Sequence, residues 1–247
     1  MSCFERKVTH GVALWVCVVM LGAGCTRHWA ISHPQQQDLP LHESLWAMQG
    51  AKGRALLDKH SQDADARVLL ANFESQIYTS YCGIASAVMA LKSLKISSVS
   101  QRSFFTPKAT AVRAQQAVFY GGMTLGELGA LLQAHGATAK VNHAGDSSVE
   151  QFRKAAAANL NRAGDLLLVN YLRKAIHQRT GGHISPVAAY DADTDRVLIL
   201  DSSSYKYPPV WVAVGDLFRA MNTVDKSANN TRGWIDVSPI QAKESES

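Results

Sequence analysis

The sequence has 247 residues, of which 47% are hydrophobic and 18% are charged, and its formal net charge is +5. This composition excludes global disorder and a fibrous chain, and the lack of an 18-residue apolar run beyond the first thirty residues excludes a multi-span membrane protein. Basic and acidic residues are intermixed, without the basic blocks and interleaved aromatics of nucleic-acid binders. We therefore expect no nucleic-acid partner.

Residues 1–25 predict a signal peptide, because a short charged start with Arg6 and Lys7 precedes the apolar run 11–23. That run is too short to span a bilayer comfortably. It ends in small residues before Cys25, which resembles the lipobox of bacterial lipoproteins, although Leu21 stands one place further from the cysteine than usual. We predict export to the periplasm and lipidation of Cys25, with an uncleaved amphipathic helix as the alternative.

Residues 26–45 are polar and interrupted by proline, which predicts a tether or extended arm before a catalytic domain over 46–238 and a polar tail over 239–247. Helical spacing starts near Ser44 and recurs over 84–94, and capping-box patterns at 124–127 and 147–150 open two further helices, the first ending at Gly136. Strand-like runs dominate the last 80 residues, namely 139–141, 166–171, 184–190, 197–200, 210–213 and 234–237. The predicted class is α+β, with a helical N-terminal half packed on an antiparallel sheet from the C-terminal half.

Cys82 is the one thiol that remains after the predicted signal peptide, so it has no partner for an intramolecular disulfide. It directly precedes a helical segment, where the helix dipole and free backbone N–H groups lower the pKa of a thiol. Gln76, six residues upstream, could share an oxyanion hole with the Cys82 N–H. The alternatives are a small buried residue at the helix start and a surface glutamine.

His183 and Asp201 flank a turn of composition Asp191-Ala-Asp-Thr-Asp195. A hairpin centred near residue 193 sets position 183 opposite about 203, so Asp201 falls diagonally near His183. An imidazole beside a carboxylate is what a Cys-His-acid triad requires. Each residue alone is equally typical of a strand edge or a turn.

Three segments together resemble the phytochelatin synthase family, most closely its bacterial one-domain branch: Gln76-x5-Cys82-Gly-x-Ala-Ser, Gly181-Gly-His-x-Ser-Pro-x-Ala-Ala-Tyr190 and Leu200-Asp-x3-Tyr-Lys-Tyr-Pro-Pro-x-Trp211. The resemblance runs from about residue 45 to 238. It implies a papain-like fold, a triad of Cys82, His183 and Asp201, and Gln76 as the oxyanion residue. It also implies a γ-glutamylcysteine acyl-enzyme made from glutathione, with glycine leaving.

The resemblance and charge complementarity also indicate residues that bind glutathione. Arg232 would hold the α-carboxylate of the γ-glutamyl group and Asp225 its α-ammonium. The candidates near the acceptor or leaving-glycine side are Asn170, Arg173 and Lys206, and Gly182 would leave room for substrate beside His183. For each charged residue, an ordinary surface role is the alternative.

No protein-bound metal or other cofactor is expected, because the nine histidines are scattered without the spacing of metal ligands. Cadmium or zinc would enter as an activator or as metal–glutathione thiolate. The expected activity is mainly transfer of the acyl group to water and weakly to a second glutathione, in glutathione turnover or metal detoxification. The rivals are a papain-like peptidase acting on peptides or proteins, and a lipoprotein that binds metal–glutathione complexes without turnover. The expected membrane contact is the lipid anchor alone, and a homodimer is left open.

Overall fold

The computed structural model describes residues 34–179 and 181–240. The predicted signal peptide, the lipidation site Cys25 and most of the polar tail lie outside these residues. Across the two described ranges, no helix combines the length and hydropathy that a membrane span needs.

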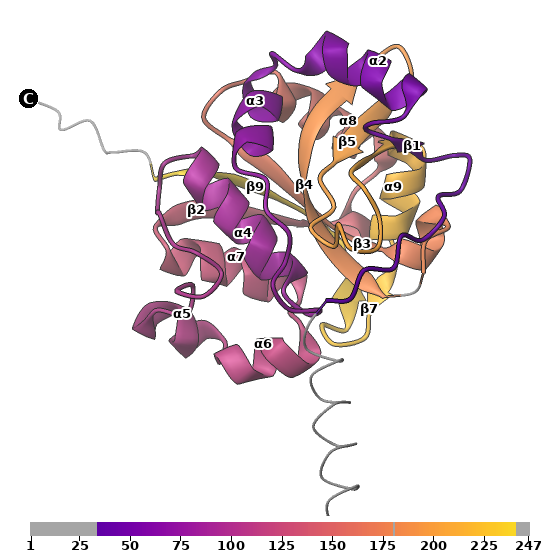
Figure 1. Ribbon diagram of the computed structural model, residues 1–247. Helices are drawn as coiled ribbons and strands as arrows, with labels where there is room; N and C mark the ends of the chain where they lie inside the picture. The colour runs from indigo at the N-terminus through magenta and orange to yellow at the C-terminus, as the bar shows by residue number, and fades with distance from the viewer. Residues whose placement is uncertain (1–33, 180, 241–247) are drawn as a thin grey trace, which may run out of the picture.

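A seven-stranded antiparallel sheet forms the centre of the molecule (Figure 1). Its order is β1 (Trp46–Ala47), β6 (Val210–Ala213), β5 (Arg196–Ile199), β4 (Gly182–Asp191), β3 (Leu166–Leu172), β9 (Gly233–Pro239) and β2 (Ala137–His143). All six predicted strands are present, and the sheet is covered by helices, so the predicted α+β class is confirmed. The mixed arrangement fits a papain-like fold.

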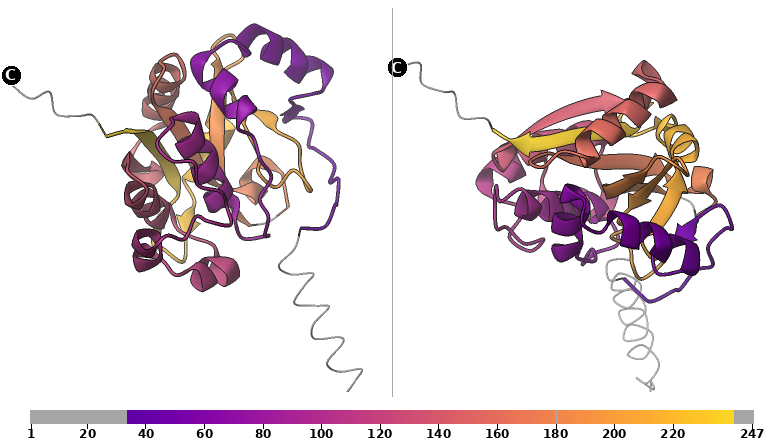
Figure 2. Two further views of the ribbon diagram at one scale, coloured as in Figure 1. Left: turned by 60° about the vertical axis from the view of Figure 1, so that its left-hand side comes forward. Right: turned by 90° about the horizontal axis from the view of Figure 1, so that it is seen from above.

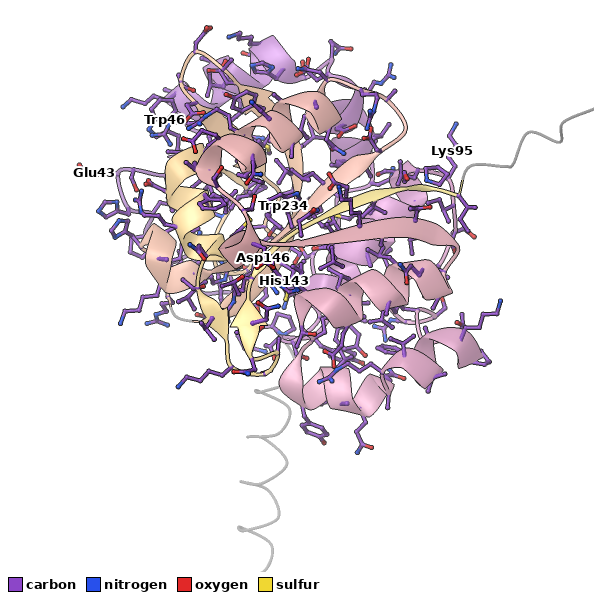
Figure 3. All side chains as sticks on the ribbon, turned by 180° about the vertical axis from the view of Figure 1, so that it is seen from behind. Glu43, Trp46, Lys95, His143, Asp146 and Trp234 are labelled. Carbon is purple, nitrogen blue, oxygen red and sulfur yellow. The ribbon has the colours of Figure 1, made fainter. Side chains whose placement is uncertain are left out.

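Helices cover both faces of the sheet (Figures 1 and 2). The helices packed on one face come mainly from the N-terminal half, and they are α2 (Ala51–His60), α3 (Ala64–Ala71), α4 (Cys82–Ser93), α5 (Pro107–Val112), α6 (Gln115–Gly121) and α7 (Leu125–Ala134). The other face carries α8 (Val149–Leu160) and α9 (Val214–Met221). Each face has its own buried apolar cluster. Trp234, labelled in Figure 3, lies in the second cluster, with its ring centroid 5.2 Å from that of Phe152.

Short elements complete the chain: η1 (Ala144–Asp146), η2 (Arg173–Ile176) and the small ribbon of β7 (Val224–Asp225) and β8 (Asn230–Thr231). Before β1, residues 34–42 form an arm on the surface. The N–H groups of Gln37 and Leu39 donate to the carbonyl oxygens of Tyr205 and Lys206 at 2.8 and 3.0 Å. The arm therefore lies along the segment that follows Asp201.

The capping boxes set two helix starts. Thr124 and Glu127 form the predicted box at the start of α7. The box of α8 forms one residue later than predicted, between Ser148 and Gln151, because the Ser148 hydroxyl accepts from the Gln151 N–H. Ser147 instead donates to the Gln151 side chain.

Asp65 in α3 is a buried carboxylate whose Oδ2 has no hydrogen-bond partner within the described residues. Burial, aided by the charge of Asp165, raises the pKa of Asp65 from 3.8 to about 8. The folded protein thus keeps a proton that the unfolded chain releases as the pH rises above 3.8. This difference lowers the free energy of unfolding progressively up to about pH 8.

We expect Asp65→Asn to stabilise the protein near pH 8 by roughly 2–4 kcal/mol and to have little effect near pH 4. Urea unfolding of both proteins across this range measures the difference. The exposed Asp58→Asn in the preceding helix is the matched control and should follow the wild-type curve. An Asp65→Asn curve parallel to wild type would contradict the buried-proton argument.

Candidate active site

The β4–β5 hairpin brings His183 and Asp201 together. Val187 pairs with Ile199, which is the register predicted for a turn centred near residue 193, and a bulge between positions 187 and 189 shifts the rest of the ladder. Leu200 then donates its N–H to Pro186 O at 2.9 Å. Asp201 follows directly, diagonal to His183 as expected.

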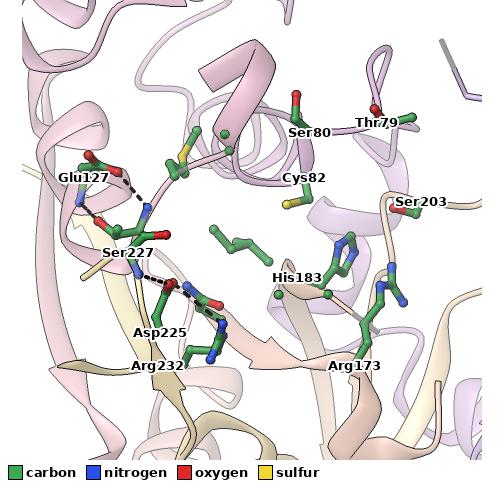
Figure 4. Close-up of a pocket in the computed structure, with 18 of the residues that line it drawn as sticks. Thr79, Ser80, Cys82, Glu127, Arg173, His183, Ser203, Asp225, Ser227 and Arg232 are labelled. Carbon is green, nitrogen blue, oxygen red and sulfur yellow. Dashed lines mark hydrogen bonds and ion pairs between the residues drawn. The ribbon is translucent and has the colours of Figure 1, made fainter. Parts of the chain in front are cut away.

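Cys82, His183 and Asp201 form a contiguous chain of polar groups (Figure 4 shows the first two). The Cys82 thiol at the first residue of α4 lies beside the His183 imidazole, which lowers the pKa of the thiol. On the other side of that ring, Nε2 lies 2.8 Å from Asp201 Oδ1, at ion-pair distance but without the alignment of a hydrogen bond. Since Nε2 faces the acid, Nδ1 is the ring atom left for the thiol.

Arg173 also binds the carboxylate of Asp201. Its NH1 and NH2 atoms donate to Oδ2 and Oδ1 at 2.7 and 2.8 Å, and both side chains are buried. The Ser203 N–H adds a third bond at 2.8 Å. Burial alone would raise the pKa of Asp201, but His183 and Arg173 outweigh it and hold that pKa well below its usual range.

The charges around Cys82 favour a thiolate beside an imidazolium. Burial opposes the charged thiolate, yet the hydrogen bond and charge of His183, a backbone bond from Ile184 and the charge of Arg173 together lower the pKa of Cys82. Burial and Arg173 act to lower the pKa of His183, but Asp201 and Cys82 outweigh them and raise it. The two shifts widen the pH range in which both groups are charged.

Gln76 departs from its predicted position. It is buried, and its two amide hydrogens are used by the carbonyl oxygens of Tyr78 and Thr79, each at 2.8 Å. Its Oε1 accepts from the hydroxyls of Ser202 and Ser203. The side chain therefore braces the loop before Cys82 against the segment after Asp201. In this arrangement it offers no N–H to an oxyanion, which corrects the expectation from spacing.

A cleft of about 450 Å³ opens over Cys82 and His183. All six residues expected to bind substrate contribute to its walls, namely Asn170, Arg173, Gly182, Lys206, Asp225 and Arg232. Asp201 and Gln76 lie behind the walls. Arg173 lines the cleft, but its guanidinium is bound to Asp201. It therefore does not offer a free cation to a substrate as Arg232 or Lys206 could. Burial and repulsion by Arg173 lower the pKa of Lys206.

Arg232 presents one edge of its guanidinium to the cleft. NH1 is used within the protein, with its shortest bond, 2.8 Å, to Val224 O. Nε is buried without a hydrogen-bond partner in the described part of the chain, and NH2 lies 4.0 Å from Asp225 Oδ2. A Cβ on Gly182 would sit 3.3 Å from NH2, so the glycine lets the guanidinium approach the strand. The Nε–NH2 edge and the Asp225 carboxylate therefore lie side by side (Figure 4).

Part of the cleft wall has no counterpart among the residues predicted from the sequence. Tyr120 and Met123 line it together with Arg113, which donates to Glu127 Oε1. These residues come from short helices and turns with no recognisable motif. Ser203, which bonds both Gln76 and Asp201, was likewise not predicted. No group of three or more His, Cys, Asp or Glu side chains in the described ranges has the geometry of a metal site.

Known proteins with sequences similar to this chain are glutathione gamma-glutamylcysteinyltransferases. Glutathione gamma-glutamylcysteinyltransferase 3 of Lotus japonicus is 30% identical over 178 residues, which is 70% of this chain and 37% of the relative. Glutathione gamma-glutamylcysteinyltransferase 1 of the same plant is 32% identical over 175 residues, 69% and 35% of the two chains. The glutathione gamma-glutamylcysteinyltransferase of Schizosaccharomyces pombe is 27% identical over 165 residues, 65% and 40%.

The chain thus spans less than half the length of these curated relatives. The family itself is matched more fully, since the phytochelatin synthase domain aligns with residues 36–234. That range contains all the described walls of the cleft and both strands of the hairpin that carries His183. The chain therefore belongs to the phytochelatin synthase family.

Proposed function

We propose that this protein is a cysteine acyltransferase that takes γ-glutamylcysteine from glutathione through a covalent thioester on Cys82. The observation that carries the proposal is the chain of contacts from Cys82 through His183 and Asp201 to Arg173, at the base of a cleft. The names of the relatives, which are glutathione gamma-glutamylcysteinyltransferases, support the same substrate.

In the proposed first step, the Cys82 thiolate attacks the carbonyl carbon of the Cys–Gly amide. The His183 imidazolium then gives its proton to the glycine nitrogen as the C–N bond breaks, and glycine leaves. In the second step, neutral His183 takes a proton from water or from the amine of a second glutathione as its oxygen or nitrogen attacks the thioester carbonyl. The C–S bond then breaks, which releases γ-glutamylcysteine or phytochelatin and restores the Cys82 thiolate beside the His183 imidazolium. Asp201, fixed by Arg173, keeps the ring oriented and stabilises its charged form.

The oxyanion formed in both steps needs donors other than Gln76 as it now lies. The first residues of α4 have backbone N–H groups with no acceptor inside the helix. We assign the oxyanion to the N–H groups at Cys82 and Gly83, next to the nucleophile. A Cβ on Gly83 would lie 2.5 Å from Met123 Sδ, so the glycine lets Met123, a residue of the cleft wall, pack against the start of α4.

The charged pair Arg232 and Asp225 supports recognition of the γ-glutamyl group. The γ-linked glutamate of glutathione keeps its α-ammonium and its α-carboxylate free on one carbon, whereas an α-linked glutamate uses its α-carboxylate in the peptide bond. The Nε–NH2 edge of Arg232, whose Nε has no hydrogen-bond partner among the described residues, suits a carboxylate, and the neighbouring Asp225 suits an ammonium. A general peptidase does not require this pair. Cadmium or zinc would enter as metal–glutathione thiolate, bound as substrate.

The experiment that tests this function compares glutathione with its α-linked isomer Glu-Cys-Gly, with and without cadmium, and identifies the products by mass. We expect glycine release and a γ-glutamylcysteinyl adduct on Cys82 with glutathione, and at least tenfold slower release from the isomer, which corresponds to about 1.4 kcal/mol. The ratio of γ-glutamylcysteine to phytochelatin measures hydrolysis against transfer. Equal cleavage of the two isomers would favour the peptidase, and the absence of an adduct would favour a binding protein.

Arg232→Ala should lower kcat/KM for glutathione by roughly ten- to a hundredfold, because a charge-assisted contact contributes about 1.5–3 kcal/mol. Arg232→Lys should recover part of the loss, since an ammonium cannot reproduce the planar fork. The rate at which iodoacetamide alkylates Cys82 should stay unchanged. Arg219→Ala, which removes an exposed arginine from α9, is the control. Parallel losses in turnover and alkylation would mean that Arg232 supports the fold instead.

We also propose that the chain is exported and anchored through lipid on Cys25, on the strength of the apolar run 11–23 and the small residues before the cysteine. Cys25→Ser should move the protein from the membrane fraction to the soluble periplasmic fraction of bacterial cells. Cys82→Ser, at the thiol that lines the cleft, should leave the distribution unchanged. Membrane association that survives Cys25→Ser would favour an uncleaved N-terminal helix.

A further inference from the structure

Exposed apolar side chains gather at the mouth of the cleft. Among the described residues, the large hydrophobic side chains that are exposed are Val112, Tyr120, Val224 and Ile240. Tyr120, 63% exposed, lines the cleft itself, and Val112 and Val224 directly precede Arg113 and Asp225, which also line it. Single exposed apolar residues are ordinary. We call Val112, Tyr120 and Val224 the rim patch, because three such residues share one end of the molecule, near α5, α6 and β7 (Figure 1).

The segment that forms α5 and α6 at this end carries no acidic residue. Residues 96–126 contain no aspartate or glutamate and three lysines or arginines, and Glu127, which follows them, is paired with Arg113. Lys108 on α5 is exposed, and Lys226 follows the β7 strand. Asp225 is the nearest carboxylate to Val224 in sequence, and it faces Arg232 inside the cleft (Figure 4). A basic and apolar rim of this kind matches an anionic lipid surface.

The chain also enters the domain at this end. The arm starts at Pro34, and its residues Gln37 and Leu39 pair with Tyr205 and Lys206 beside the cleft. Nine Cα–Cα steps separate Pro34 from Cys25, so an anchor on Cys25 can lie at most about 30 Å from the start of the arm. A membrane anchor therefore holds the mouth of the cleft near the bilayer.

We propose that the rim patch rests on the surface of the membrane that anchors the chain, so that the cleft opens at the lipid surface. The inference rests on the proposed anchor, and it adds a second membrane contact to the lipid. Tyrosine suits this position because its ring is apolar and its hydroxyl can stay in water. Because the anchor keeps the rim at a high local concentration near lipid, a small patch suffices for contact.

The test is hydrogen exchange measured by mass spectrometry on the full chain, purified with its N-terminal modification and reconstituted into vesicles of neutral and anionic phospholipid. Peptides covering α5–α6 and β7–β8 should exchange about threefold or more slowly on vesicles than in detergent. Peptides covering α2, away from the rim, should exchange equally in both. The protection should increase with the anionic lipid fraction.

The double variant Tyr120→Ser, Val224→Ser should lose this protection while the protein still floats with the vesicles. Ile240→Ser is the matched control, since Ile240 is 65% exposed but stands about 25 Å along β9 from Arg232. It should keep full protection. Glutathione turnover in detergent reports separately on the proposed chemistry.

Three outcomes would overturn the proposal. Flotation without slower exchange at the rim would leave the anchor standing and exclude the lipid contact. Protection that persists in detergent and depends on protein concentration would mean that a second copy of the chain covers the patch. Failure to float would exclude both the anchor and the contact, whereas normal turnover in that case would leave the enzymatic proposal intact.

Discussion

Replacing Cys82 with serine is expected to lower glycine release from glutathione by a thousandfold or more, which corresponds to about 4 kcal/mol or more in the activation barrier. The serine hydroxyl stays protonated at neutral pH, whereas the surroundings of Cys82 lower the pKa of the thiol. The fold should persist, because the smaller hydroxyl occupies the same first position of α4. A variant that retains more than a few per cent of the wild-type rate would remove Cys82 from the role of nucleophile.

The alkylation of Cys82 by iodoacetamide gives a second readout that does not depend on the substrate. Because the pKa of Cys82 is lowered and that of His183 is raised, the rate should persist at pH values below the range in which the free thiol of glutathione reacts. His183→Gln should move the reaction toward the pH dependence of that free thiol. An unchanged profile would mean that the thiolate is stabilised by the helix start alone.

The hairpin is the part of the site that the sequence predicts best. The composition of residues 191–195 is typical of a turn, and the strands on both sides are mainly apolar. One register therefore fits both the turn and the strands. That register carries Asp201 to His183 without any knowledge of the rest of the fold. The position of Cys82 follows equally from local pattern, since the apolar helix begins at that residue.

The partners of Gln76 and Arg173 could not be predicted from the local sequence pattern. The spacing between Gln76 and Cys82 restricts their separation, but it does not say which partners the amide takes. Ser202 and Ser203, more than 120 residues away in the chain, accept that role through the tertiary fold. Arg173 likewise meets Asp201 only because η2 lies next to the end of β5. Pairings at such sequence distance have no signal in a single chain.

The short helices were missed for two different reasons. α5 and α6 have six and seven residues and mostly exposed side chains, so they show too little apolar periodicity to be recognised. α9 does carry the signal, because Val214, Leu217, Phe218 and Met221 have the spacing i, i+3, i+4 and i+7. The helical conformation of α5 and α6 therefore depends on tertiary contacts. The amphipathic pattern of α9, in contrast, was sufficient to predict a helix from the sequence.

Arg173→Met is expected to have the second large effect, because it leaves the buried carboxylate of Asp201 without its bidentate partner. Arg173 is 4% exposed and Asp201 is fully buried. Removing one member of such a pair costs about 3–5 kcal/mol of stability. We also expect kcat for glycine release to fall by about a hundredfold, roughly 2.7 kcal/mol, since Asp201 no longer has a fixed position from which to orient His183.

A pH profile separates this role from a purely structural one. The charge of Arg173 lowers the pKa of both Cys82 and His183, so its removal should raise both pKa values. The rise in alkylation of Cys82 should therefore shift to higher pH in Arg173→Met. Arg173→Lys retains the charge but not the fork, so it should keep the wild-type pH profile while losing activity. Lys174→Met, which removes the adjacent exposed charge, should change neither.

The double variant Arg173→Met, Asp201→Asn shows whether Arg173 acts through the acid. If it does, the losses of the two single variants should not add, because the second substitution removes a group that the first has already disabled. Losses that add fully would mean that Arg173 contributes independently, for example by contacting the substrate from the wall of the cleft. In that case the guanidinium would return to the set of substrate-binding residues.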